Sequence, residues 1–225
     1  MKKLFTFFLL SLLVLSGCAA ATPASTAEVV TVQYTAATQP WLAGLVGCAG
    51  ENIVSAEIRS ADTLDIQAAE ISMRIGETAN LLIHTYQIGT DALRVIANRQ
   101  NPVTQLSIEQ VRGLFGGQIK NWKDVKGSDA PVQVWVFATG EDVEQVFEQT
   151  GLGDSPVTST ARLATSPGEM AQAIANDVNA IGILTRHWQA EGVADLFTVA
   201  SVPVLAILPA EPQGVLRQVI DCLQK

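Results

Sequence analysis

The segment from Ile88 to Val136 constrains the fold of this chain most, because its element boundaries follow one another in a readable order. Residues 92–97 form an apolar run rich in β-branched side chains, which favours a strand. The strand is expected to stop at Asn101-Pro102, since a residue before proline is pushed out of the helical region. A second strand is expected over 132–137. The segment is therefore predicted to run strand, helix, strand.

The helix between these strands has clear start and stop signals. Ser107 stands before it, and Gln110 lies three residues later, the spacing of a capping box. The apolar residues that follow have the three- and four-residue spacing of one buried helical face; they are Ile108, Val111, Leu114 and Phe115. Gly116-Gly117 is expected to end the helix.

The remaining sequence alternates in the same way. Further strands are expected over 29–34, 52–58, 64–69, 81–86, 180–184 and 202–208, and further helices from Gln39-Pro40-Trp41, over 141–149, from Ser166 and over 215–223. Alternating strands and helices favour an α/β class with mostly parallel sheets. The hydrophobic content of 48% is ample for a buried core.

The first 18 residues predict export and lipid attachment. Lys2 and Lys3 precede an apolar run over 4–15, which is too short for a membrane span of about 20 residues. Leu15-Ser16-Gly17-Cys18 resembles the bacterial lipobox, so residues 1–17 are expected to be a lipoprotein signal peptide and Cys18 the lipid attachment site. The alternative is an ordinary signal peptide with an incidental cysteine. Residues 18–27 are predicted to be a flexible tether.

The mature chain is acidic. Removal of Lys2 and Lys3 with the signal peptide changes the formal net charge from −8 to −10. Nucleic acids and anionic lipid surfaces attract basic proteins, so neither is expected as a partner. A small anion is not excluded, because backbone amides at helix N-termini bind anions locally.

Several stretches in succession resemble one known family. They are GTDAL, NP, LSIEQVRGLFGGQIKNWKDV and DAPVQVWV, followed by GEMAQAIANDVNAIGILT. The chain thereby resembles the phosphate-binding periplasmic proteins of ABC transporters and the wider type II solute-binding superfamily. The resemblance implies a two-lobed periplasmic-binding-protein-like fold, each lobe a mostly parallel sheet flanked by helices, with the ligand cleft between the lobes. Lobe 1 is expected over 28–90 with 190–225, and lobe 2 over 91–189.

The resemblance also implies a function. It implies a lipid-anchored receptor on the extracytoplasmic face of a bacterial membrane, expected to bind phosphate or another small oxyanion and to pass it to an ABC transporter permease. The alternative is a lipoprotein of the same fold that has lost the anion site and acts as a sensor or interaction protein.

The first implied ligand loop follows the strand at 29–34. Its candidate ligand-binding residues are Thr35, Ala37 and Thr38, at the position where the phosphate-binding family has an oxyanion-binding loop. The alternative for Thr38 is simple helix capping, with Pro40 at an early helical position.

The second implied loop follows the strand at 132–137. Its candidates are Thr139 and Gly140, but Glu141 and Asp142 come next where the phosphate binders carry hydrogen-bond donors. Acidic residues commonly occupy a first helical turn. If these two instead face the cleft, they repel a dianion, which argues against phosphate as the ligand.

Three further residues complete the candidate site. Ser72 and Arg74 match a family segment that lines the cleft, and Arg74 is the best candidate for pairing with an anion because its fork suits two oxygens. The alternative is an Arg on a solvated loop. Asp91 matches the family's GTDAL motif, and a hinge role is favoured over ligand contact.

Cys48 and Cys222 remain after processing, in an exported chain where disulfides are permitted. The resemblance places the first and last helices in the same lobe, which makes a bridge between them conceivable. The alternative is two buried thiols.

No motif for catalysis or metal binding occurs in the sequence. His84 and His187 are the two histidines, they are far apart, and no HExxH, GxSxG, P-loop or GxGxxG pattern is present. The chain is therefore expected to be neither an enzyme nor a metalloprotein, and to need no cofactor.

Overall fold

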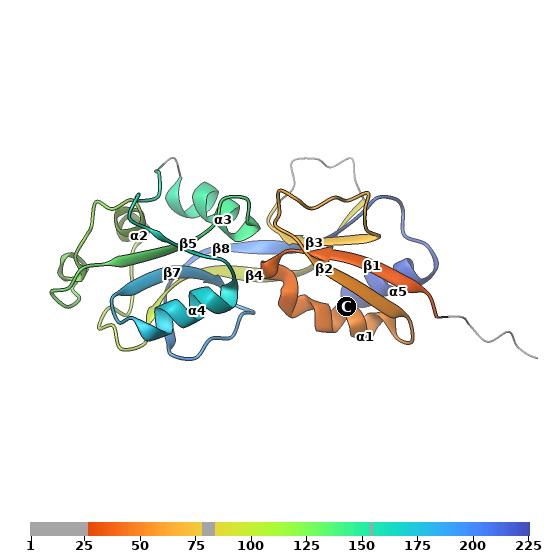
Figure 1. Cartoon of the computed structure of the whole chain (residues 1–225), viewed down its shortest axis with the longest axis horizontal. Coiled ribbons are helices and arrows are strands. Elements are labelled where there is room, and N and C mark those ends of the chain that lie inside the picture. Colours follow the sequence, from red (N-terminus) through yellow and green to blue (C-terminus); the bar gives the residue numbers. More distant parts are fainter. Residues whose placement is uncertain (1–26, 78–83, 154) are drawn as a thin grey trace, which may run out of the picture.

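A computed structural model describes residues 27–77, 84–153 and 155–225 (Figure 1). The strands are β1 (Val29–Tyr34), β2 (Ile53–Ile58), β3 (Ile71–Ile75), β4 (His84–Asn98), β5 (Gln133–Phe137), β6 (Arg162–Ala164), β7 (Ala180–Thr185) and β8 (Val193–Leu208). The α-helices are α1 (Leu42–Ala49), α2 (Ile108–Phe115), α3 (Asp142–Val146), α4 (Pro167–Asn176) and α5 (Gly214–Leu223). Short 3₁₀ helices, η1 (Ala36–Trp41) and η2 (Trp122–Val125), and one π-helix, η3 (Phe147–Leu152), complete the set.

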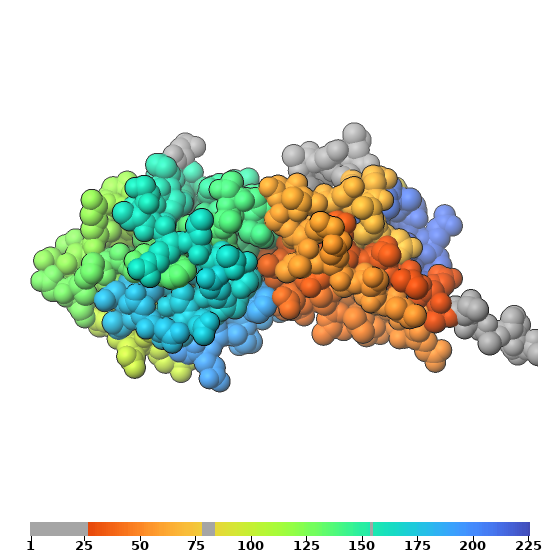
Figure 2. Space-filling model, viewed as in Figure 1, coloured from red at the N-terminus to blue at the C-terminus, as the bar shows by residue number. Residues whose placement is uncertain are grey.

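The eight strands form one sheet in the order β2-β1-β3-β8-β4-β7-β5-β6. Strands β2, β1 and β3 pair in parallel at one end, and β7, β5 and β6 pair in parallel at the other. We call the part with β1–β3, α1 and α5 the first half, and the part with β5–β7 and α2–α4 the second half. Figure 2 shows the two halves in direct contact on the face in view.

Two long antiparallel strands connect the halves. Strand β4 has 15 residues and β8 has 16, so each reaches about 50 Å at 3.3 Å per residue. Their pairing shifts register at three places, between Gln87 and Gly89, between Leu93 and Arg94, and between Val95 and Ile96. Such irregularities bend a strand pair. The boundaries between the two predicted lobes, near residues 90 and 190, remain a proposal.

Gly89 allows one of these strands to pass close to the first half. A Cβ atom at Gly89 would lie 2.2 Å from the Trp41 ring, closer than any side chain permits. The glycine of the GTDAL motif therefore has a packing reason: β4 runs directly against the indole at the end of η1.

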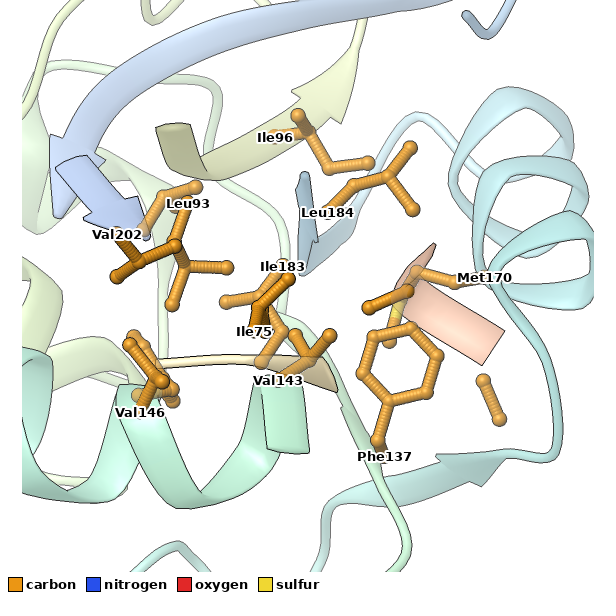
Figure 3. Close-up of a cluster of buried hydrophobic side chains, with 14 of the residues drawn as sticks. Ile75, Leu93, Ile96, Phe137, Val143, Val146, Met170, Ile183, Leu184 and Val202 are labelled. Atoms are coloured by element: carbon orange, nitrogen blue, oxygen red, sulfur yellow. The ribbon is translucent and has the colours of Figure 1, made fainter. Parts of the chain in front are cut away.

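A shared apolar cluster packs the halves together. Figure 3 shows Ile75, the last residue of β3, beside Val143 of α3 and Ile183 of β7. Ile75 and Ile183 are fully buried. Leu93 and Val202, from β4 and β8, border the same cluster (Figure 3). The end of β3 is thus packed into the core of the second half.

Most expected elements form, with one clear error. The Ser107–Gln110 capping box is present with both of its hydrogen bonds, as predicted. The predicted strand over 64–69 is wrong: these residues make turns, and the strand lies at β3. The strand forms instead where Ser72–Ile75 pair with Val204–Ile207 of β8, a pairing distant in sequence that the local alternation at 64–69 does not reveal. Residues 81–83 of the expected strand over 81–86 lie outside the described residues.

Cys48 of α1 and Cys222 of α5 form a disulfide, with their Cα atoms 5.7 Å apart. The two helices pack on each other in the first half (Figure 1). The bridge therefore joins the beginning and the end of the folded chain within that half.

The predicted signal peptide, most of the tether and Cys18 lie outside the described residues. Among the helices that the structure describes, none is long and apolar enough to cross a membrane.

We expect replacement of both Cys48 and Cys222 by alanine to lower the free energy of unfolding by about 2–5 kcal/mol. The bridge closes a loop with a sequence separation of 174 residues, and a long loop gains more disorder in the unfolded chain when it is released. Urea unfolding of both proteins measures the difference. Addition of a reductant should destabilise the wild type and leave the double variant unchanged; equal sensitivity would contradict the bridge.

Candidate functional site

The loop after β1, residues 35–38, lies at the carboxyl end of the first parallel strands, and we call it the shelf. The backbone N–H of Thr35 donates to the Met73 carbonyl of β3 at 3.0 Å. The Thr38 hydroxyl lies within hydrogen-bond distance of two carbonyls, that of Thr35 at 3.0 Å and that of Met73 at 3.3 Å. Thr35 and Thr38 are fully buried. Thr38 thus braces the loop through carbonyl contacts, and it does not cap a helix.

Asp142 reaches this shelf from the second half. It is the first residue of α3 and is fully buried. Its Oδ2 atom accepts hydrogen bonds from the Thr35 hydroxyl at 2.6 Å and from the Ile75 backbone N–H at 2.9 Å. Its Oδ1 atom accepts from the Val143 N–H at 2.9 Å. A carboxylate of one half is therefore held by donors of the other.

Two more contacts join the halves at the same place. Arg74 of β3 donates from Nη2 to Oε1 of Gln145, on α3, at 2.9 Å. The Asp62 N–H donates to the Gly140 carbonyl at 3.2 Å. Gly140 has φ +99°, and a Cβ atom there would lie 2.6 Å from an Asp62 carboxylate oxygen. Gly140 thus lies so close to Asp62 of the first half that a residue with a side chain would displace the Asp62 carboxylate.

The shelf is also contacted from its other side. Trp188 donates from Nε1 to the Ala36 carbonyl at 3.2 Å, and the His187 ring lies 4.6 Å from the Trp41 ring, centroid to centroid. Asp91 is buried and orders this loop, since its Oδ1 accepts from the Arg186 and His187 backbone N–H groups at 3.0 and 3.3 Å. The carboxylate of the GTDAL motif therefore ties β4 to the turn after β7.

Burial dominates the electrostatics of α3. Desolvation raises the pKa of the Asp142 carboxyl, against the lowering effects of the Thr35 and Ile75 hydrogen bonds and of the Arg74 charge. Desolvation also raises the pKa of Glu141, with further increases from Asp142 and Asp62. The pKa of Glu144 rises to about 7, mainly through burial. The start of α3 thus carries carboxyl groups that the fold removes from water.

The candidate residues from the sequence fall into three groups. Thr35, Arg74 and Gly140 meet at the contact between the halves. Thr38 and Ala37 are buried behind it. Ser72 is fully buried, and its hydroxyl has no hydrogen-bond partner among the described residues, whereas Thr139 is exposed.

Sequence reasoning singled out Asp142 as a departure from the family pattern and did not foresee its partners. Gln145 and the Ile75 amide were missed altogether. The unusual acidic pair after Thr139-Gly140 was the sequence feature that pointed to this contact. The Ile75 amide could not be predicted, because every residue type except proline has a backbone N–H.

These features can be compared with known proteins. Residues 52–219 match the family model described as the PBP superfamily domain. The chain belongs to the PBP superfamily. Protein SphX of Synechococcus elongatus is 24% identical over 146 residues, which cover 61% of this chain and 43% of that protein. The match thus spans less than half of that relative's length.

Several solved structures share the fold of this chain, which confirms the expected α/β fold of the periplasmic-binding-protein type. A putative phosphate ABC transporter substrate-binding protein with bound phosphate from Clostridium perfringens superposes with a TM-score of 0.79 at 21% identity, over 87% of this chain and 93% of that one. An ABC-type phosphate transport receptor from Vibrio cholerae gives 0.67 at 21% identity, over 87% and 93%. The CcmR regulatory domain of Synechocystis PCC6803, in complex with 2-PG, gives 0.66 at 14% identity, over 88% and 96%.

We expect Gly140→Ala to destabilise the protein by about 1–3 kcal/mol, because a side chain at positive φ is strained and its Cβ would displace the Asp62 carboxylate. Thermal unfolding measures the effect. Gly47→Ala in α1 is the matched control, since its Cβ meets nothing within 4 Å and alanine favours a helix. Equal stability of the Gly140 variant and wild type would contradict the close approach.

We expect Glu144→Gln to change how stability depends on pH. The folded state raises the pKa of Glu144 from 4.5 to about 7, so the wild type loses stability as pH rises through that window, by up to about 3 kcal/mol. The glutamine variant keeps an acceptor for the Phe137 N–H, which Glu144 binds at 3.1 Å, and carries no charge. It should match the wild type near pH 4 and exceed it above pH 7.

Urea unfolding at a series of pH values tests this expectation. The exposed Glu191→Gln is the control and should follow the wild type throughout. A constant difference between the Glu144 variant and wild type across the range would show that folding does not change the pKa of Glu144, and would contradict the expectation.

Proposed function

We propose that this chain is the solute-binding component of an ABC transporter, anchored by a lipid on Cys18 to the extracytoplasmic face of a bacterial membrane. Its ligand is a small anion, phosphate or another oxyanion, taken up between two lobes, residues 28–90 with 190–225 and residues 91–189. The protein performs no reaction on this solute and passes it to a membrane permease.

The hydrogen-bond donors of the shelf support an anionic solute. The Thr35 hydroxyl and the Ile75 amide converge on one carboxylate oxygen, at 2.6 and 2.9 Å. Both donors lie at the carboxyl ends of β1 and β3, which pair in parallel. Ligands of α/β proteins bind outside the carboxyl ends of parallel strands, so these donors stand where a solute is expected.

Arg74 supplies the positive charge that the proposal needs. It is partly buried on β3, and its charge acts on Asp142. A guanidinium donates two parallel hydrogen bonds to an oxyanion, and its present partner, the neutral amide of Gln145, is readily exchanged for a charged one. Arg74 is therefore the residue proposed to pair with the solute, and the buried hydroxyls of Ser72, also on β3, and Thr38, in η1, are proposed to assist it.

The names of the relatives agree with this chemistry. Two of the solved structures are described as a phosphate transporter substrate-binding protein and a phosphate transport receptor. The same fold also occurs in a regulatory domain, so the fold alone does not decide between transport and sensing.

Thermal unfolding of the full chain in mild detergent tests the proposal, with phosphate, sulfate, molybdate, tungstate and small organic anions. A solute at 100 times its Kd should add about 2.7 kcal/mol of stability, a shift of roughly 5–10 °C for a protein of this size. Arg74→Ala should abolish the shift, and the exposed Arg217→Ala should retain it. No shift with any solute would favour a sensor or interaction lipoprotein instead.

A further inference from the structure

The carboxylate of Asp142 is bound as a ligand would be. Three N–H or O–H groups converge on its two oxygens, and the closest, the Thr35 hydroxyl, lies at 2.6 Å. Two of the three donors belong to the first half, whereas Asp142 belongs to the second. A short bond to a fully buried carboxylate is the arrangement expected of a built anion site.

A capping role does not explain this geometry. The N-cap of α3 is Glu141, whose side chain makes no capping bond, and Asp142 is the first residue inside the helix. Only the Val143 N–H comes from the helix itself. The Oδ2 atom makes its bonds to Thr35 and Ile75, so Asp142 mainly serves the contact between the halves.

Asp142 and a solute oxyanion require the same donors. The Thr35 hydroxyl carries one hydrogen and the Ile75 amide carries one, and both are already given to Oδ2. The Glu141 carboxyl lies between these charges, since desolvation raises its pKa most and the nearby Asp142 and Asp62 carboxylates both raise it further. A second anion added to this cluster would meet repulsion from three carboxyl groups, with Arg74 as the opposing charge.

We propose that Asp142 is an internal ligand of this receptor, which occupies the oxyanion position on Thr35 and Ile75 until an anionic solute displaces it. This inference rests on the proposed function and adds to it how the site is kept closed. The wild type must withdraw its own carboxylate before an oxyanion binds, so its apparent affinity is the intrinsic affinity multiplied by the fraction of molecules with Asp142 displaced. At a displaced fraction of about 1%, the measured Kd is about 100-fold weaker than the intrinsic one.

Equilibrium dialysis with labelled inorganic phosphate, on the full chain in mild detergent, tests the proposal. Asp142→Ala should bind phosphate at least about ten-fold more tightly than the wild type, because the competing carboxylate is gone. Glu191→Ala removes the same charge from an exposed position and should bind like the wild type. The double variant Asp142→Ala with Thr35→Val should lose the gain, which would assign the gain to the shelf.

Asp142→Asn keeps the shape of the side chain and serves if the alanine variant does not fold. It removes the negative charge while one oxygen still accepts from Thr35, so a gain of about three-fold or more in phosphate affinity is expected. Circular dichroism verifies that each variant is folded before dialysis.

The outcomes separate this inference from the proposed function. Equal phosphate affinity in the wild type and in the folded Asp142 variant would overturn the internal ligand and leave the receptor standing. A gain in the variant, together with a wild type that responds to no solute in the thermal panel, would show that the Asp142 carboxylate stays in place, and would overturn both its displacement by a solute and the receptor. Absence of phosphate binding in both would overturn the internal ligand, and the thermal panel would then decide the receptor.

Discussion

The contact between the end of β3 and the start of α3 organises the molecule. Ile75 places its side chain in the apolar cluster of the second half, while its backbone N–H donates to the Asp142 carboxylate at 2.9 Å. Burial of a charged group costs several kcal/mol unless hydrogen bonds replace its water. The buried carboxylate therefore requires three elements in fixed positions. The shelf supplies the Thr35 hydroxyl, β3 supplies the Ile75 amide, and α3 carries Asp142 itself.

The long β4–β8 pair lies between the parallel strands of the two halves and connects the halves that meet at this contact. The pair passes from one half to the other beside Leu93 and Val202, which border the apolar cluster (Figure 3). The loop of Trp188 and His187 closes on the opposite side of the shelf, and Asp91 orders it. The loop after β1 is consequently held from both sides by the second half.

Local signals in the sequence predicted some elements and misled at others, for identifiable reasons. The capping box at Ser107 and the run at 29–34 were predicted well, since each depends on neighbours within a few residues. The strand expected over 64–69 was wrong, because β3 forms where Ser72–Ile75 find Val204–Ile207 across the sheet, a pairing distant in sequence. In the site, Thr35, Arg74 and Gly140 were singled out through the family resemblance, whereas Gln145 and the Ile75 amide had no sequence signal.

By itself, the sequence determined the α/β class, the superfamily and the acidic departure after Thr139-Gly140, because periodicity, caps and motifs are written in adjacent residues. Only the tertiary structure decided what that departure does. Thr35 and Asp142 are 107 residues apart in the chain, and a hydrogen bond of 2.6 Å between them depends on how the β4–β8 pair sets one half against the other. A buried carboxylate points toward the hydrogen-bond donors that tertiary packing places near it. The residues adjacent to it in the sequence do not show which donors those are.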